Sequence, residues 1–198
     1  MIKAGKLPKE LEAAAGAGFA STYRKDMRQE ALKYLQVSNV GGKPLPPINA
    51  LAKMNGNANN GKQVFSKICA TCHQVSNEGS AFGPALTKIG SKLGKDALYL
   101  AIIHPDNGIS FGYEGYVFKM KDGNIVAGII SSETEDAIEI VTPGGTKKKY
   151  EKSQLLSRKM MENSMMPSNL HQTISQQELV NLVEFLYAQQ EKVVVVNK

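Results

Sequence analysis

Two cysteines and a histidine lie within five consecutive residues, inside the stretch FSKICATCHQ. Cys69 and Cys72 are the only two cysteines of the 198-residue sequence, and His73 follows the second one directly. Two thiols three residues apart on a helical turn can add across the two vinyl groups of one haem, and the adjacent imidazole can then bind its iron. The Cys-x-x-Cys-His spacing therefore predicts one covalently bound haem c, with His73 as its proximal ligand.

Three other uses of these side chains stay open at this point. A thioredoxin-like redox pair would follow a strand, whereas a helical pattern precedes Cys69. A zinc site needs four ligands; His104 and His171, the other two histidines, could complete one with the cysteines, but their spacing is irregular. The third alternative is a plain disulfide or a chance match. The surrounding sequence favours haem c over all three.

Composition narrows the class of protein. Hydrophobic residues make up 42% of the chain and charged residues 21%, which is ordinary for a globular protein. The formal net charge is +6, and the basic residues are scattered apart from the stretch TKKKYEK at 146–152. A nucleic-acid-binding surface would concentrate them, so no nucleic acid is expected as a partner. No run of about 18 apolar residues exists, so the sequence predicts no transmembrane segment.

Two segments are expected to precede the cysteines. Residues 7–36 show helical spacing of apolar side chains, interrupted at Gly16 and Gly18. We therefore expect residues 1–37 to form a helical hairpin. Glycine, proline and asparagine dominate residues 38–59, a composition that is typical of a linker.

A domain of residues 60–190 is expected to hold the motif. Its first helix has Asn60 as its expected N-cap and carries both cysteines. Its last helix begins with Ser175 and Glu178 in a capping box, and an apolar stripe follows. Between them, the segment KDALYLAIIHP predicts a short helix that Pro105 ends.

Residues 112–156 have a different pattern, with alternating polarity and many valines, isoleucines and tyrosines. They predict an antiparallel β insert, with turns at Asp122-Gly123 and Gly144-Gly145. The insert is expected to be a small sheet or a half-closed barrel with strands at 115–121, 124–132, 137–142 and 146–152. From there to the last helix, the sequence predicts an irregular loop with at most a short helix.

The sequence around the cysteines resembles class I c-type cytochromes. The stretches that carry the resemblance are GKQVFSKICATCHQV, GPALTKIG and LVNLVEFLYA. The first and the last are similar to the terminal helices of that family, and Gly61 would allow them to cross closely. The resemblance implies that the Pro84 carbonyl accepts a hydrogen bond from the His73 ring, and that Leu86 packs on the haem face.

A sixth iron ligand is expected from the stretch NSMMPSNL, shortly before the last helix. In the family that the sequence resembles, this ligand is a methionine directly before a proline, which implies Met166. Met165 is the runner-up. His171, close to the same loop, and His104 are further alternatives, and bis-histidine ligation would lower the potential relative to His/Met ligation.

The β insert sharpens the resemblance, because ordinary class I cytochromes c lack it. The order of the elements resembles that of the planctomycete-type haem-binding domain: first helix, β insert, the stretch SMMP and last helix. That domain is often the C-terminal domain of sugar-dehydrogenase-like proteins. The resemblance covers residues 60–188. It implies a segment of a larger protein with a mainly α cytochrome c fold around one haem and an antiparallel β insert, α+β overall.

The expected function is that of a monohaem cytochrome domain that transfers single electrons and is not itself an enzyme. A redox partner protein or a fused dehydrogenase domain is its expected partner, and thioether attachment implies the periplasm or another extracytoplasmic compartment. One alternative is a haem-based enzyme or small-molecule sensor with a labile sixth ligand; another is an interaction module folded around haem. The insert is expected either to shield one haem edge or to dock a partner through Lys147, Lys148 and Lys149.

Overall fold

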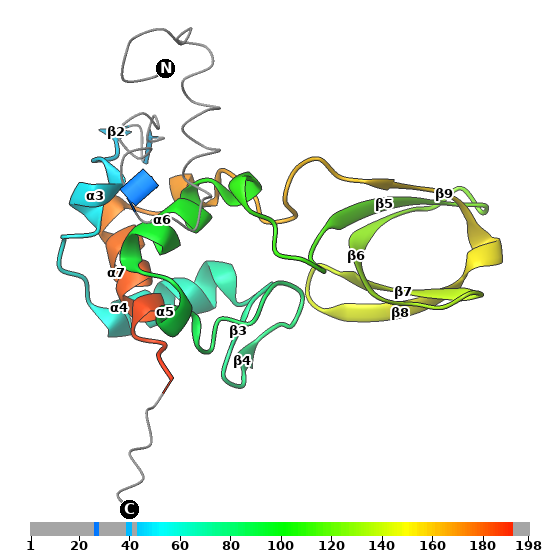
Figure 1. The fold of residues 1–198 in the computed structure, drawn as a ribbon, viewed down its shortest axis with the longest axis horizontal. Coiled ribbons are helices and arrows are strands. Elements are labelled where there is room, and N and C mark those ends of the chain that lie inside the picture. Colours follow the sequence, from blue (N-terminus) through cyan, green and yellow to red (C-terminus); the bar gives the residue numbers. More distant parts are fainter. Residues whose placement is uncertain (1–25, 28–38, 41–42, 192–198) are drawn as a thin grey trace, which may run out of the picture.

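The structure is a computed structural model that describes residues 26–27, 39–40 and 43–191. The predicted helical hairpin of residues 1–37 lies outside the described residues, apart from 26–27. Helices gather at one end of the molecule and a curled sheet forms the other end (Figure 1). In the part of the chain that the structure describes, no helix combines the length and the apolar character of a membrane span.

Two helices from the ends of the domain cross at the centre of the helical end. α4 (Ala58–Val64) continues as a π-helical turn, η2 (Phe65–Cys69), and packs against α7 (Gln176–Tyr187). A side chain on Gly61 would place its Cβ 1.9 Å from the backbone oxygen of Asn181, so only glycine allows this approach. The close crossing that the sequence predicted is therefore present.

Caps define where these helices begin. In α7, the Ser175 hydroxyl accepts from the Glu178 amide, and the Glu178 carboxylate accepts from the Ser175 amide at 2.7 Å. The predicted capping box is confirmed. The prediction of Asn60 as the other cap is wrong: α4 begins at Ala58, and the Asn57 side chain accepts from the Asn60 amide at 3.0 Å. Both asparagines suit a cap, and the structure uses the earlier one.

Three further α-helices belong to the described helical end. They are α3 (Ile48–Leu51), α5 (Ile89–Lys92) and α6 (Lys95–Ile103). Within the predicted linker, Ile48 and Leu51 of α3 are buried in the main core together with Leu98 and Ile103 of α6. α6 ends before Pro105, as its sequence predicts.

The five-stranded sheet is antiparallel in the order β8-β7-β6-β5-β9. It has a core of its own, built from Phe118, Met120, Ile138 and Ile140. The helical end adds two short hairpins, β1 (Asn39–Val40) with β2 (Lys43–Pro44) and β3 (Gln74–Val75) with β4 (Glu78–Gly79). The strands of the sheet are β5 (Gly115–Met120), β6 (Ile125–Glu133), β7 (Ala137–Thr142), β8 (Thr146–Glu151) and β9 (Leu155–Met160).

The first four strands lie where alternation and turn residues placed them, but the prediction of a loop after residue 156 is wrong. β9 forms there and pairs with β5, with Phe118 opposite Arg158. Its side chains are exposed apart from the half-buried Leu155, so it has no alternating pattern to find. Hydrogen bonding to β5, a contact distant in sequence, creates this strand.

The expectation of a mainly α fold is also wrong. The sheet contributes five strands and a separate core beside the helices α3 to α7, so the fold is α+β in two parts of comparable weight. The physical reason is that β9 extends the sheet to five strands. A sheet of this size has enough apolar side chains to form its own core, so the sheet is more than an insert on a helical scaffold.

Candidate functional site

The Cys-x-x-Cys-His stretch forms one compact turn at the end of η2. The Ala70 amide donates to the Phe65 carbonyl at 2.9 Å, which widens the helix at Cys69. The amides of Cys72 and His73 then both donate to the Cys69 carbonyl, at 3.0 and 2.8 Å. Backbone geometry alone therefore brings the two thiols and the imidazole to a single turn.

The His73 ring is held by the segment that follows. Its Nδ1 lies 2.8 Å from the Pro84 carbonyl oxygen, and because a carbonyl can only accept, Nδ1 carries the proton. Burial lowers the pKa of His73, while the hydrogen bond to Pro84 opposes that shift. The ring is therefore neutral at pH 7, with the lone pair of Nε2 available to a metal. This is the hydrogen bond that the resemblance implied.

Gly83 is a site residue that the sequence reasoning missed. Its amide donates to the Cys72 carbonyl at 2.6 Å. A Cβ at this position would lie 2.6 Å from Cε1 and 2.9 Å from Nδ1 of His73, so the imidazole lies directly against the glycine backbone. The signal available in the sequence was the Gly-Pro dipeptide that also supplied Pro84.

We expect Gly83→Ala to push the imidazole away from the Pro84 carbonyl. The added methyl group has to displace either a closed turn or the ring, and overpacking of this kind costs about 1–3 kcal/mol. The measurement is the yield of haem-loaded protein together with its melting temperature. Gly108→Ala is the matched control, because nothing lies within 4 Å of the Cβ that it adds. Equal yields and equal melting temperatures for the two variants would contradict the role given to Gly83.

The two cysteines are free thiols; Cys69 is buried and Cys72 is half-buried. Burial, followed by the neighbouring Cys72, raises the pKa of Cys69 to about 12. Burial also raises the pKa of Cys72, against a hydrogen bond from the Gly144 backbone. The two thiols do not form a disulfide, and no group of three or more His, Cys, Asp or Glu side chains among the described residues could hold a metal ion. Among the described residues, the two cysteines therefore do not gather the further ligands that a zinc site needs.

The sheet contacts this site through the β7–β8 turn. Besides the Gly144 contact with Cys72, a Cβ on Gly145 would lie 2.5 Å from the Ser80 hydroxyl oxygen. Both glycines have positive φ, 92° and 80°, so the turn needs them for its conformation as well as for the close approach. The sequence predicted this turn but not that it reaches the cysteines.

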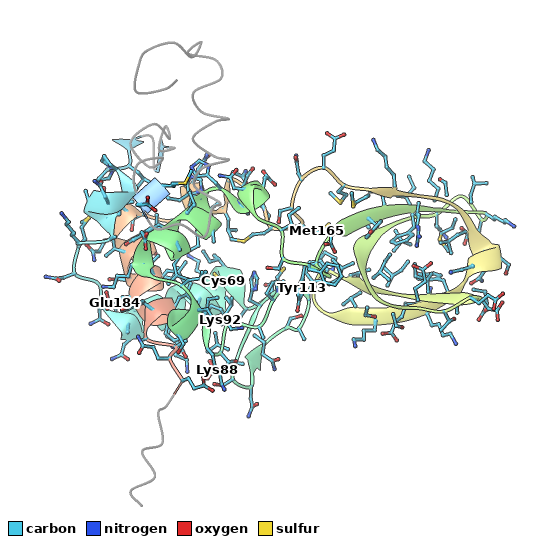
Figure 2. The ribbon with its side chains drawn as sticks, viewed as in Figure 1. Cys69, Lys88, Lys92, Tyr113, Met165 and Glu184 are labelled. Atoms are coloured by element: carbon cyan, nitrogen blue, oxygen red, sulfur yellow. The ribbon has the colours of Figure 1, made fainter. Side chains whose placement is uncertain are left out.

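An apolar cluster extends the contact between sheet and site. Its buried members are Phe82, Ile129 and Val141, and Cys72, Tyr113 and Met165 pack against them. In Figure 2, Tyr113 and Met165 lie between the helical end, where Cys69 is found, and the sheet. The sheet therefore contacts the Cys72 side of the site.

The two candidate methionines lie in different surroundings. Met166 is partly buried and packs against the main core, as does Leu86, and Cys69 belongs to that core. Met165 belongs to the cluster with Phe82, and its Sδ lies only 2.9 Å from where Gly115 of β5 would carry a Cβ. Met165 therefore packs against the sheet, and Met166 packs with the residues on the Cys69 side.

His104 and His171 lie close to each other. His171, in η5 (Leu170–Thr173), is 1% exposed, and neither of its ring nitrogens has a hydrogen-bond partner; the same holds for Nε2 of His104. Burial lowers the pKa of both side chains, and the proximity of His104 lowers that of His171 further. Both rings are therefore neutral at pH 7, and no described contact joins either one to His73.

Comparison with known proteins points to the same cofactor. Residues 58–141 match the family model described as Cytochrome c, over less than half of the chain. No curated protein matches the chain. The match includes Cys69, Cys72, His73, Gly83, Pro84 and Leu86, whereas Gly144, Gly145 and the two methionines lie beyond residue 141. A Cytochrome c domain implies covalently bound haem c and supports haem-based electron transfer, so residues 58–141 are similar to the cytochromes c in sequence and in the chemistry of their donor groups.

Proposed function

We propose that this chain is a monohaem c-type cytochrome domain that transfers single electrons, with Cys69 and Cys72 as thioether anchors and His73 and Met166 as axial ligands. The observation that carries the proposal is the His73 turn: two free thiols lie beside a neutral imidazole whose Nδ1 is tied to Pro84, which leaves Nε2 for iron. This donor set fits haem c, and bound haem would supply the redox-active iron.

The chain's own residues hold and tune such a group. The Pro84 carbonyl fixes the orientation of the His73 ring and raises its basicity as a ligand. A thioether from Met166 is a soft ligand, which favours ferrous iron and raises the potential relative to a second histidine. The cluster of Phe82, Ile129 and Val141 packs against the half-buried Cys72 and lowers solvent exposure on that side, and lower solvent exposure disfavours the ferric charge.

Electron transfer is a better match to the site than catalysis. Met166 packs against the core that holds Cys69, and as a ligand of bound haem it would occupy the iron position that a substrate needs. We further propose an extracytoplasmic location, where thioether attachment takes place, and a redox protein or a fused dehydrogenase-like domain as the electron partner. The order of elements supports this context through its resemblance to the planctomycete-type domain.

The test of the proposal is attachment itself. The protein is matured in a bacterial host that can assemble c-type cytochromes and is then denatured. We expect its mass to exceed that of the chain by one tetrapyrrole, and a pyridine haemochrome spectrum of the thioether-linked type. A bare chain mass, with no pigment after denaturation, would overturn the proposal.

The choice between the adjacent methionines has its own test. Met166→His is expected to lower the midpoint potential because imidazole stabilises ferric iron relative to a thioether, whereas Met165→His should leave the potential close to that of the wild type. The two variants are matched, since they make the same change at neighbouring positions, and potentiometric titration of the Soret band measures both. A lower potential for Met165→His alone would reassign the ligand to Met165.

A further inference from the structure

We infer that Asp106 and Ser164 are positioning residues that hold Met166 at the iron. The inference rests on the proposed function, because it takes Met166 as the axial ligand. It concerns a pair of hydrogen bonds that connect the end of α6 to the loop before α7, two segments that are 58 residues apart in the sequence.

The two hydrogen bonds are consecutive. The Ser164 amide donates to Oδ1 of Asp106 at 2.7 Å, and the Met166 amide donates to the Ser164 hydroxyl oxygen at 3.1 Å. Asp106 therefore fixes the backbone at Ser164, and the Ser164 side chain fixes the backbone at Met166. The side chain of Met166 begins from a backbone position that both contacts determine.

Asp106 is held in place by its position at the end of α6. Asp106 lies in the 3-10 turn η3 (Pro105–Asn107) that follows α6, and the last residues of that helix, Ile102 and Ile103, are buried in the main core. Pro105, at the start of the turn, is buried too and restricts the backbone dihedral φ. The carboxylate is thus presented from a rigid corner of the helical end.

Few other hydrogen bonds hold the middle of the loop that carries Met166. At its start, the Met161 amide donates to the Gly115 carbonyl at 2.8 Å, and near its end the Leu170 amide donates to the Pro167 carbonyl at 3.3 Å. Between these points, the loop backbone is hydrogen-bonded to another element through the Ser164 amide, which donates to Asp106. Loss of this hydrogen bond would leave Met165 and Met166 held only by their apolar contacts while both ends of the loop stay attached, so Met166 would be positioned less firmly.

The consequence is a shift between Met-bound and Met-free iron. An added ligand such as imidazole binds only the Met-free state, so its apparent affinity rises in proportion to the population of that state. One hydrogen bond contributes about 0.5–1.5 kcal/mol, and the Asp106 contact is exposed. Removal of either link should therefore strengthen imidazole binding by roughly threefold to tenfold.

The experiment measures imidazole dissociation constants of ferric, haem-loaded protein by Soret titration. Ser164→Ala and Asp106→Ala are expected to bind roughly threefold to tenfold more tightly than the wild type. Asp106→Asn keeps an oxygen acceptor for the Ser164 amide and should bind like the wild type. Ser168→Ala, at an exposed serine of the same loop, and Asp136→Ala, at an exposed aspartate between β6 and β7, are the matched controls.

A second measurement distinguishes failure of the inference from failure of the proposed function. Met166→Ala should lose the ferric absorption band that is characteristic of a methionine–iron bond; if the band persists, Met166 is not the ligand, and both the ligand assignment and the inference fall. If Met166→Ala loses the band but Ser164→Ala and Asp106→Ala bind imidazole like the controls, only the inference is overturned. Lower melting temperatures with unchanged imidazole affinity would show a structural role alone, which also overturns it.

Discussion

Gly61→Ala is expected to destabilise the helical end strongly, because the added methyl group meets the backbone of α7. The new Cβ would lie 1.9 Å from the Asn181 oxygen, 2.6 Å from the Asn181 carbonyl carbon and 2.7 Å from Cβ of Phe185. Two of these neighbours are backbone atoms of α7, so no side-chain rotation can make room. The helices have to separate, which we expect to cost more than the roughly 1–3 kcal/mol of ordinary overpacking.

The separation has a second effect at the site. α4 leads directly into η2 and Cys69, and α7 carries Leu182 and Phe185, which lie in the same core as Phe65. The Phe65 and Phe185 rings are in contact, with centroids 5.5 Å apart. We therefore expect Gly61→Ala to reduce the amount of haem-loaded protein as well as its stability.

The loss of stability is measured by denaturant unfolding of the purified variant, with the circular dichroism of the helices as the signal. Gln63→Ala is the control on the same helix, because Gln63 is exposed and alanine favours the helical state. If Gly61→Ala and Gln63→Ala unfolded at the same denaturant concentration, the close crossing of α4 and α7 would contribute nothing to stability.

The sequence could predict those parts of the site that depend on neighbours along the chain. Cys69, Cys72 and His73 share a turn because of their spacing, and Pro84 follows in a recognisable Gly-Pro pattern. The strands up to β8 were placed by alternating polarity and by glycine turns, which act within a few residues. Helix α7 was placed by its capping box and its apolar stripe for the same reason.

The missed features depend on contacts between distant segments. β9 exists because β5 pairs with it, and Gly144 is a site residue because the β7–β8 turn reaches Cys72. Neither pairing leaves a mark in the local pattern. Met165 and Met166 have the same side chain, so the sequence could separate them only by resemblance, whereas the structure gives them different surroundings. The mainly α prediction failed for a related reason, since a strand without alternation was not counted.

Loss of both proposed thioether links, at Cys69 and Cys72, is expected to have the other large effect, and to affect the two ends of the molecule unequally. Cys69→Ala combined with Cys72→Ala leaves haem, if it binds at all, free to dissociate. A group that binds only the native state stabilises it by an amount that depends on its concentration, about 4 kcal/mol at a thousandfold excess over the dissociation constant. A covalent group gives its stabilisation at every concentration. Its loss should therefore lower the melting temperature of the helical end substantially.

The sheet is expected to survive this loss because its core is separate. Phe118, Met120, Ile138 and Ile140 pack among themselves and not against the cysteines, whereas Cys69 is a member of the helical core. Hydrogen exchange detected by mass spectrometry measures amide protection in the helical end and in the sheet of the same sample. We expect the amides of α4 and α7 to lose protection while those of β6 and β7 keep most of theirs. Uniform loss over both parts would mean that the sheet depends on the haem-binding end for its stability, and unchanged protection throughout would mean that the fold does not need the attached group.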